Sequence, residues 1–366
     1  MFLPKYSITN KTLSNIVKIE LDLFYLKSVE VPVEWTKRLK TESLVKRIFG
    51  GTRLLGLSID LESVSKIVTD EPDRDEKTAE VASRLGLIIK ERDLQIVLNL
   101  INTCKLVDQI SYISNRFAQE KVLFKEMLQI NKLIGERMVP SSQVGVLRSG
   151  LISGETFVTH ALANELPYQL EEFMLWFENS GIDQIHPMVK FAVCMAELMR
   201  IAPFENYNEI TALFFGYAFL GSFGYETKWV LLEEEIYRSK EKLREAFVSY
   251  EQSGWELTVI IEYFVGILQL STSKARVRAL NIEGVSVKYR SGGGRAVALS
   301  ERQLAIMEEI TTRNEMTIKQ IREILPLVSD DTILRDIKDL VNKKMVRKRG
   351  KTKGAVYVLG KVKSFG

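Results

Sequence analysis

The stretch that decides the fold is His186-Pro-Met-Val-Lys-Phe-Ala-Val-Cys-Met-Ala-Glu-Leu-Met-Arg-Ile-Ala-Pro-Phe-Glu-Asn-Tyr-Asn-Glu-Ile210. Pro187 stands where helices commonly begin, and the residues after it are almost all apolar. The Ala202-Pro203-Phe204 triplet ends this helix because a proline disfavours helical backbone in the residue before it. A short polar loop follows, and a second apolar run begins near Glu209. Helices that are apolar on all sides are buried, so the stretch predicts two central helices joined by a polar loop.

The residues around this stretch also favour helices. Through residues 1–270, apolar side chains recur at three- and four-residue spacing, and strand-like alternation is scarce. The length of 366 residues suggests two or three domains, and 46% hydrophobic with 27% charged residues is typical of a soluble globular protein. We expect an N-terminal helical domain over 1–115, a helical core over 116–270, a linker over 271–298 and a small domain over 299–366. The helices expected in the body span 13–26, 33–47, 61–69, 75–87, 93–106, 110–117, 122–136, 166–179, 188–200, 209–223, 232–253 and 257–269.

The composition excludes several classes of site. Two cysteines and two histidines are too few for a disulfide framework or a Cys-rich zinc site, and we expect no metal site. The longest uncharged run, Ile210–Tyr225, has sixteen residues, which is shorter than the ~20 needed to cross a bilayer. The sequence starts without a basic and hydrophobic leader, so we expect a cytoplasmic location and no membrane partner.

Positive charge is concentrated in the last fifth of the chain. Residues 299–366 contain 15 Lys and Arg against 9 Asp and Glu, whereas the other 298 residues carry a balance of −2. A basic terminal domain on a near-neutral body is typical of proteins that bind nucleic acid.

The pattern of this terminal segment predicts three helices and a hairpin. Ser300 with Gln303 and Thr317 with Gln320 have the spacing of capping boxes, and Ser329 precedes two acidic residues that suit a helix start. The expected helices span 301–313, about 318–325 and 330–343. Two short strands are expected over 345–348 and 355–359, on either side of a glycine-rich basic turn, which makes a β-hairpin. This order resembles the winged helix-turn-helix.

The third of these helices resembles the recognition helix of winged-helix regulators. We expect a core face of Ile333, Leu334, Ile337, Leu340 and Val341, with Asp336 outside it. Seven basic residues fall within the eleven residues 343–353, a density suited to phosphate neutralisation. The residues predicted to contact double-stranded DNA are Ser329, Thr332, Arg335, Lys343, Lys344, Arg347, Lys348, Arg349, Lys351 and Lys353. Four aspartates make this helix acidic, which leaves protein–protein binding open as an alternative.

The central stretch resembles the motif of the Fic family. Active members carry His-Pro-Phe-x-Asp/Glu-Gly-Asn-Gly/Lys-Arg between two such helices and transfer AMP from ATP to a protein hydroxyl. The resemblance extends over Arg148–Trp176, which looks like the flap region, and over Val230–Leu268, which looks like the closing helices. It implies a mainly α protein: a Fic-like helical bundle with an N-terminal helical extension, plus a small C-terminal winged-helix (α+β) domain.

The same resemblance implies a degenerate site. The catalytic His of the motif falls on Ala202 and the acidic metal position on Asn206. The motif's glycines fall on Tyr207 and Glu209, and its Arg falls on Ile210. Only Pro203, Phe204 and Asn208 match. The degenerate loop therefore consists of Ala202, Pro203, Phe204, Asn206, Asn208, Glu209 and Ile210.

These departures remove three parts of the chemistry together. Alanine cannot take a proton from a hydroxyl, which imidazole does near neutral pH. A neutral Asn206 is a weak ligand for Mg²⁺, and Glu209 repels phosphate where glycine would let backbone amides approach it. For His160, which follows the flap-like segment, we expect a structural role. We expect the same for His186, because it stands about 20 Å along the helix from the loop.

We therefore expect a catalytically degenerate Fic-fold protein that acts as a DNA-binding regulator in a prokaryotic cytoplasm, without catalytic residues or cofactors. A homodimer and a protein partner are both compatible with the sequence. Two alternatives stay open. One is a divergent Fic protein adenylyltransferase that would use ATP and Mg²⁺, and the other is a protein-interaction scaffold that does not bind DNA.

Overall fold

The computed structural model describes residues 2–28, 33–116, 122–152, 158–180, 185–288, 299–325, 328–350 and 355–360. The chain forms two compact units. The first consists of Met1–Lys27 and Thr41–Arg276, and the second of Ser28–Lys40 and Val277–Gly366. The first unit, the helical unit, therefore contains most of the residues expected as the N-terminal helical domain and the core. The second, the C-terminal unit, contains the expected small domain.

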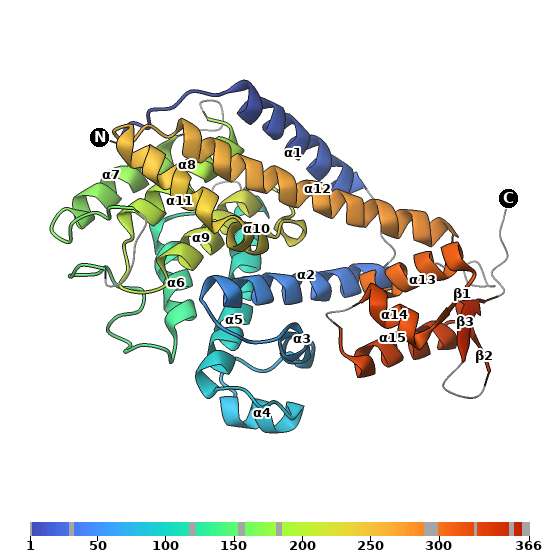
Figure 1. Ribbon diagram of the computed structural model, residues 1–366. Coiled ribbons are helices and arrows are strands. Elements are labelled where there is room, and N and C mark those ends of the chain that lie inside the picture. Colours follow the sequence, from blue (N-terminus) through green and yellow to red (C-terminus); the bar gives the residue numbers. More distant parts are fainter. Residues whose placement is uncertain are drawn as a thin grey trace. The chain divides into compact units, whose positions relative to one another are not determined.

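The helical unit consists of helices joined by loops, in agreement with the mainly α prediction (Figure 1). Three of its helices extend past the limits of the unit: α2 and α12 by several residues, and α1 by Ser28 alone. The helices are α1 (Asn10–Ser28), α2 (Val33–Leu54), α3 (Leu61–Asp70), α4 (Thr78–Leu85), α5 (Glu91–Arg116), α6 (Phe124–Gly135), α7 (Leu166–Asn179), α8 (Pro187–Ile201), α9 (Asn208–Ser222), the 3-10 helix η1 (Thr227–Trp229), α10 (Leu232–Arg238), α11 (Lys240–Gln252) and α12. Helix α12 spans Thr258–Lys288.

Helices α8 and α9 form the central pair predicted from the sequence. All residues of α8 except Arg200 are buried, and α9 is buried from Ile210 to Gly221. The pair packs against α5, α6 and α7. Gly216 lets the two helices approach closely, because a Cβ there would lie 2.5 Å from the ring of Phe191. The loop that joins α8 to α9 is thus fixed at both ends by the best-packed part of the unit.

Two expected helix boundaries are wrong. Helix α5 is continuous where we expected a break between 106 and 110, because the residues there include no glycine or proline and Asp108 lies on the exposed face. Conversely, the helix expected over 232–253 divides into α10 and α11 at Ser239. The Ser239 hydroxyl donates a hydrogen bond to the Glu235 carbonyl oxygen (2.6 Å), which is the kind of local bond that ends helices.

The first part of the expected linker is also helical. Helix α12 continues through 271–288, which we expected to be part of the linker. Side-chain contacts explain why: Ser273 donates to Asp22 (3.1 Å), and Arg276 forms an ion pair with the same carboxylate (3.0 Å). The Ser271 hydroxyl accepts a hydrogen bond from the Leu231 amide (2.7 Å). The glycine-containing residues 289–298 lie outside the described residues.

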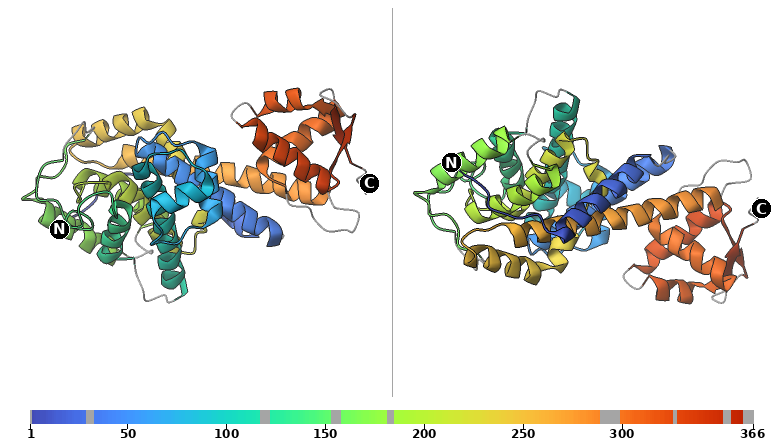
Figure 2. Two further views of the ribbon diagram at one scale, coloured as in Figure 1. Left: turned by 90° about the horizontal axis from the view of Figure 1, so that it is seen from below. Right: turned by 90° about the horizontal axis from the view of Figure 1, so that it is seen from above.

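Besides the first residues of α2 and the last of α12, the described part of the C-terminal unit contains three helices and an antiparallel sheet, drawn in orange and red in Figure 2. The sheet has the order β1-β3-β2, and α13 packs on β1 and β3 while α15 packs on β2. All three predicted helix caps are present: the hydroxyls of Ser300, Thr317 and Ser329 accept hydrogen bonds from the amides of Gln303, Gln320 and Thr332. The elements are α13 (Glu301–Arg313), β1 (Glu315–Thr317), α14 (Ile318–Ile324), α15 (Asp330–Asn342), β2 (Val346–Arg349) and β3 (Val356–Leu359).

Strand β1 was not predicted, and two residues of α15 lie on the opposite side of the helix from the one we expected. The three-residue β1 follows Asn314, which adopts a positive φ of 65°, and it is too short to give a periodic signal. Leu334, expected in the core, is 42% exposed. Asp336, expected outside, is buried because its carboxylate pairs with Arg302 (2.7 Å). The ion pair with Arg302 thus allows the charged Asp336 to lie on the inner face of α15.

No helix in the described part of the chain is long and apolar enough to cross a membrane.

Candidate functional site

The loop between α8 and α9 begins and ends in left-handed backbone. Ala202, the C-cap of α8, has φ 46°, and Tyr207, the N-cap of α9, has φ 67°. Residues other than glycine adopt this region only at a cost, so the surrounding structure must hold both residues in place.

The side chain of Asn208 makes two hydrogen bonds within the loop. Its Oδ1 accepts a hydrogen bond from the Phe204 amide (2.8 Å), and its Nδ2 donates to the Phe204 carbonyl oxygen (2.7 Å). Asn131 on α6 adds a second fastening, because its Nδ2 donates to the Asn206 carbonyl oxygen (3.0 Å) and to Thr211 (3.1 Å). The two amide side chains replace the backbone partners that an irregular loop lacks.

Arg148 fastens the loop from the opposite side. This buried side chain donates to four carbonyl oxygens, those of Ala202 (2.7 Å), Gly150 (2.7 Å), Ile201 (3.2 Å) and Ala161. Its backbone amide also donates to the Pro203 carbonyl oxygen (2.9 Å). Burial lowers the pKa of Arg148. The hydrogen bonds of the guanidinium therefore go to backbone carbonyl oxygens. They join the segment that resembles the Fic flap to the loop.

Beside the loop lies a cavity of about 300 Å³, here called the loop cavity. Of the predicted loop residues, Ala202, Asn206, Asn208, Glu209 and Ile210 line it. Pro203 and Phe204 are buried and do not. The lining residues that the structure describes are Leu54, Leu55, Ile152, Val158, His160, Met199, Ala202, Glu205, Asn206, Tyr207, Asn208, Glu209 and Ile210.

His160 lines the same cavity as Ala202, which the sequence did not predict. Its Nδ1 lies 3.2 Å from the Arg200 carbonyl oxygen. A carbonyl oxygen can only accept, so Nδ1 carries the proton and Nε2 carries the lone pair. Burial lowers the pKa of His160, so the imidazole is neutral near pH 7. His186, in contrast, caps α8 by accepting a hydrogen bond from the Met188 amide (3.2 Å).

The loop cavity is lined by both donors and acceptors of hydrogen bonds, among them the side-chain amide of Asn206 and the carboxylates of Glu205 and Glu209. Both glutamates are exposed in part, and neither lysine nor arginine is among the lining residues that the structure describes. Displacement of water by the surrounding protein raises the pKa of Glu209, although the nearby Lys240 acts in the opposite direction. In the described part of the chain, no group of three or more His, Cys, Asp and Glu side chains could hold a metal ion. The described part of the lining thus contains no Lys or Arg to pair with phosphate and no cluster of three carboxylates for a divalent metal.

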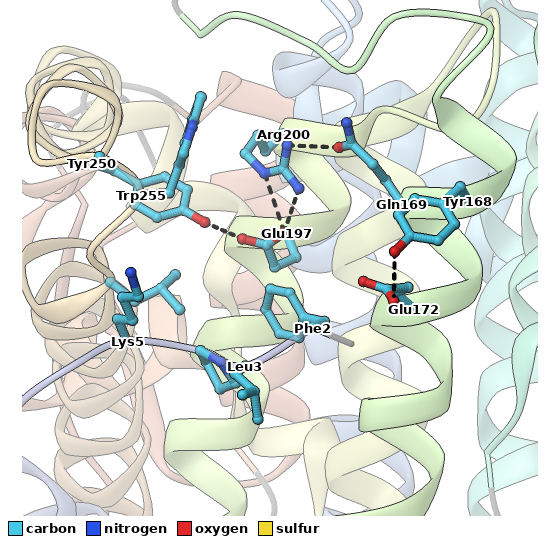
Figure 3. A pocket seen from close by; sticks show the side chains of 13 residues that line it. Phe2, Leu3, Lys5, Tyr168, Gln169, Glu172, Glu197, Arg200, Tyr250 and Trp255 are labelled. Atoms are coloured by element: carbon cyan, nitrogen blue, oxygen red, sulfur yellow. Dashed lines mark hydrogen bonds and ion pairs between the residues drawn. The ribbon is translucent and has the colours of Figure 1, made fainter.

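A second cavity, of about 380 Å³, was missed by sequence reasoning (Figure 3). On one wall the Arg200 guanidinium donates to Glu197 (2.8 Å) and Gln169 (2.9 Å), and the hydroxyl of Tyr250 donates to Glu197. The same guanidinium lies over the Trp255 ring, 5.1 Å from its centroid. The buried polar groups of this wall satisfy one another. The available signal in the sequence was the spacing of Glu197 and Arg200, two opposite charges three residues apart near the end of a mostly apolar helix.

The predicted DNA-contacting residues of the C-terminal unit lie mainly on its surface. Arg347, Lys348 and Arg349 are all exposed on β2, which is an edge strand of the sheet. Arg335 on α15 and Lys344 after it are exposed as well. Lys351 and Lys353 lie outside the described residues.

Three others are already engaged within the unit. The hydroxyls of Ser329 and Thr332 lie 2.9 Å apart at the start of α15, and the Lys343 ammonium pairs with Asp339 (2.6 Å). Asp330 likewise pairs with Arg322 (2.6 Å).

Comparison with known proteins connects the loop to a family. Residues 122–220 match the model of the Fic/DOC family. The matched residues include α6, α7, α8, the loop and all but the last two residues of α9. No curated protein matches this chain closely enough to count as a relative.

Solved structures extend the likeness beyond that domain. A Fic family protein from Desulfovibrio desulfuricans covers 100% of both chains at 16% identity, with a TM-score of 0.64. A Fic domain containing signalling protein from Bacteroides thetaiotaomicron covers 73% of this chain and 98% of its own at 15% identity (TM-score 0.58). Residues 134–508 of Fic-1 from C. elegans cover 76% and 73% at 13% identity (TM-score 0.52). At these identities the likeness establishes the fold, so the Fic-fold prediction is confirmed.

Proposed function

We propose that this chain is a DNA-binding regulator of a prokaryotic cytoplasm, and that its Fic-fold body has lost nucleotide-transfer chemistry. The C-terminal unit would bind double-stranded DNA. Its element order, α13-β1-α14-α15-β2-β3 with β3 central in the sheet, is the order of a winged helix-turn-helix. In that arrangement α15 enters the major groove and the turn between β2 and β3 is the wing.

The observation that carries the proposal is the separation of charges in the C-terminal unit. Three of the four aspartates of α15 are neutralised inside the unit: Asp330 by Arg322, Asp336 by Arg302 and Asp339 by Lys343. Arg347, Lys348 and Arg349 remain exposed. The acidity that argued against DNA binding is thus largely compensated, and an exposed basic strand remains for phosphates.

Duplex binding by the full chain tests this proposal. We expect the triple variant Arg347→Ala, Lys348→Ala, Arg349→Ala to lose about tenfold or more in affinity for a labelled duplex. The slope of log affinity against log salt should become shallower by about 2–3, because each phosphate contact contributes about 0.9 to it. Fluorescence anisotropy at several salt concentrations measures both quantities.

The matched control removes three exposed lysines of the helical unit, Lys18, Lys77 and Lys105, which changes the net charge by the same amount. We expect its affinity and its salt slope to stay close to those of the unmodified chain. Equal losses in the two triple variants would contradict the proposal. A stoichiometric co-purifying protein together with no salt-dependent duplex binding would favour the protein-interaction scaffold instead.

The proposal of a non-catalytic body rests on the loop cavity. Ala202 offers no base, Asn206 offers no carboxylate, and the guanidinium of Arg148 is bound to carbonyl oxygens. A homodimer would let two copies contact two half-sites on DNA.

One observation favours the divergent adenylyltransferase as a second candidate function. The lone pair on Nε2 of His160, in the cavity that Ala202 lines, belongs to a group able to take a hydroxyl proton. Incubation with labelled ATP, Mg²⁺ and candidate proteins separates the two functions. We expect no label transfer, whereas transfer that disappears in His160→Ala would establish the enzyme.

A further inference from the structure

One face of helix α15 is exposed to solvent, and the opposite face packs within the C-terminal unit. At 3.6 residues per turn, five exposed residues of the helix fall within about 100° of arc around its axis. They are Asp331, Leu334, Arg335, Lys338 and Asn342. The buried residues lie on the other side, and they are Ile333, Asp336, Ile337 and Leu340. The five exposed residues, here called the outer face of α15, are the part of the helix that a partner can contact.

The outer face is positive, although the helix as a whole is negative. The helix has four aspartates against one arginine and one lysine, a balance of −2. Three of the aspartates form ion pairs within the unit. The fourth, Asp331, lies on the outer face with Arg335 and Lys338, which gives this face a balance of +1. The charge of the outer face therefore suits the negative potential in a groove of DNA.

Leu334 is an apolar residue on this otherwise polar face. It is 42% exposed, although the sequence pattern placed it in the core. A single exposed leucine is common on protein surfaces, so the position of Leu334 carries the argument. This residue stands in the second turn of α15, next to Arg335, and the first turns of a recognition helix are the ones that reach base edges.

The base edges offer a leucine one favourable partner. A leucine side chain has no hydrogen-bond donor or acceptor, and the apolar group in the major groove is the C5-methyl of thymine. Arg335 differs, because a guanidinium can donate two parallel hydrogen bonds to O6 and N7 of guanine. The Cα atoms of consecutive residues lie about 3.8 Å apart, close to the rise of about 3.4 Å between base pairs. The two side chains would therefore reach neighbouring base pairs.

We propose that α15 reads a thymine through the side chain of Leu334 and, within about two base pairs of it, a guanine through Arg335. This inference rests on the proposed duplex binding and adds base recognition to it. Contact with Leu334 would bury the thymine methyl, and the Arg335 guanidinium would pair with the guanine edge. A duplex that lacks either group would bind more weakly, and each loss would depend on one residue.

Selection by the full chain from a library of duplexes with a randomised central segment gives the preferred sequence. We expect a site that contains a thymine and a guanine at this spacing. Each thymine of the selected duplex is then replaced by deoxyuracil, which keeps the base pairing and removes only the methyl group. At the thymine that Leu334 contacts, we expect the unmodified chain to lose about fourfold in affinity, as for the exposure of one methyl-sized group.

Variants assign each loss to one residue. In Leu334→Ala the same replacement should cost nothing further, because the methyl has lost its partner, whereas Leu334→Met should keep the sensitivity. Replacement of the guanine by 7-deazaguanine removes the N7 acceptor, and we expect a loss of about fivefold or more that is absent in Arg335→Ala.

The matched control is Leu61→Ala, which changes a 44% exposed leucine at the start of α3. It should bind the selected duplex and the deoxyuracil duplex as the unmodified chain does. Thermal unfolding of each variant verifies that it is folded.

The outcomes separate this inference from the proposal on which it rests. No duplex binding at all would overturn both. Duplex binding without an enriched sequence, an enriched site without thymine, or a deoxyuracil effect that is absent or equal in the unmodified chain and Leu334→Ala would overturn the base recognition alone. In that case the triple variant of β2 would still change the salt slope, because phosphate contacts do not depend on base edges.

Discussion

Arginine side chains serve different purposes in the two units. In the helical unit Arg47, Arg148 and Arg200 are largely buried, and each binds carbonyl oxygens or carboxylates of its own chain. On β2 of the C-terminal unit, Arg347 and Arg349 are exposed. The three buried arginines of the helical unit are thus part of its scaffold, whereas the exposed arginines of the edge strand are available to a ligand.

The largest effect is expected for Arg148→Met. The change leaves buried carbonyl oxygens around the loop without donors, and we expect a loss of about 3–5 kcal/mol in the free energy of unfolding. Arg347→Ala, an exposed arginine, should change it by no more than about 0.5 kcal/mol. Urea unfolding followed by tryptophan fluorescence measures both variants. Similar losses at the two positions would break the contrast.

The next effect concerns the buried pair of Arg47 and Glu233. Burial raises the pKa of Glu233 to about 7, even though the Arg47 guanidinium opposes the shift. The folded state therefore holds a proton that the unfolded chain releases near pH 4.5, so stability falls as pH rises from about 5 through 7. We expect a loss of about 2–3 kcal/mol between pH 5 and pH 8 from this group.

The variant Glu233→Gln isolates that contribution. Glutamine cannot ionise, so the difference in unfolding free energy between the unmodified chain and the variant should change by this amount across the same range. A difference that stays constant from pH 5 to pH 8 would show that the Glu233 carboxyl does not titrate there.

A smaller effect is expected for Asp336→Ala in the C-terminal unit. The change removes a partly buried ion pair with Arg302, and we expect α15 to lose about 1–2 kcal/mol of protection in amide hydrogen exchange. Asp331→Ala removes an exposed carboxylate from the first turn of the same helix, and we expect a smaller loss of about 0.3–1 kcal/mol, because only its interaction with the helix dipole disappears. Equal losses of protection in the two variants would mean that helix charge, and not the pair with Arg302, stabilises α15.

The smallest effect is expected for Ala202→His. The change restores a base, but the described part of the lining still has no metal-binding carboxylate at Asn206 and no Lys or Arg for phosphate. We therefore expect no transfer of label from ATP to protein. Measurable transfer in this variant would mean that one imidazole was the only missing part.

Much of the fold could be predicted from the sequence, because local chemistry fixes it. The apolar runs of α8 and α9 and the capping residues Ser300, Thr317 and Ser329 determine where those helices lie. The continuation of α12 could not be predicted, because it depends on contacts with Asp22, some 250 residues away in the chain. Likewise, the inward position of Asp336 depends on Arg302 in another helix.

The candidate site was predictable only in part. Alignment with the Fic motif located Ala202, Asn206 and Glu209, and all three line the loop cavity. The place of His160 could not be predicted, since it follows from the path of the segment after Arg148. The hydrogen bonds from Asn131 and Arg148 to the loop could not be predicted either. Side-chain hydrogen bonds to distant carbonyl oxygens leave no periodic pattern in the sequence.

The fastening of the loop has a consequence for how this protein can change over generations. Asn208, Asn131 and Arg148 hold the backbone of the turn, and none of these bonds uses the side chains of residues 202, 205 or 209. Replacement of those side chains therefore costs little folding free energy. An ancestral activity could be lost and a different specificity acquired at the same bend by a handful of substitutions, while the architecture stayed intact.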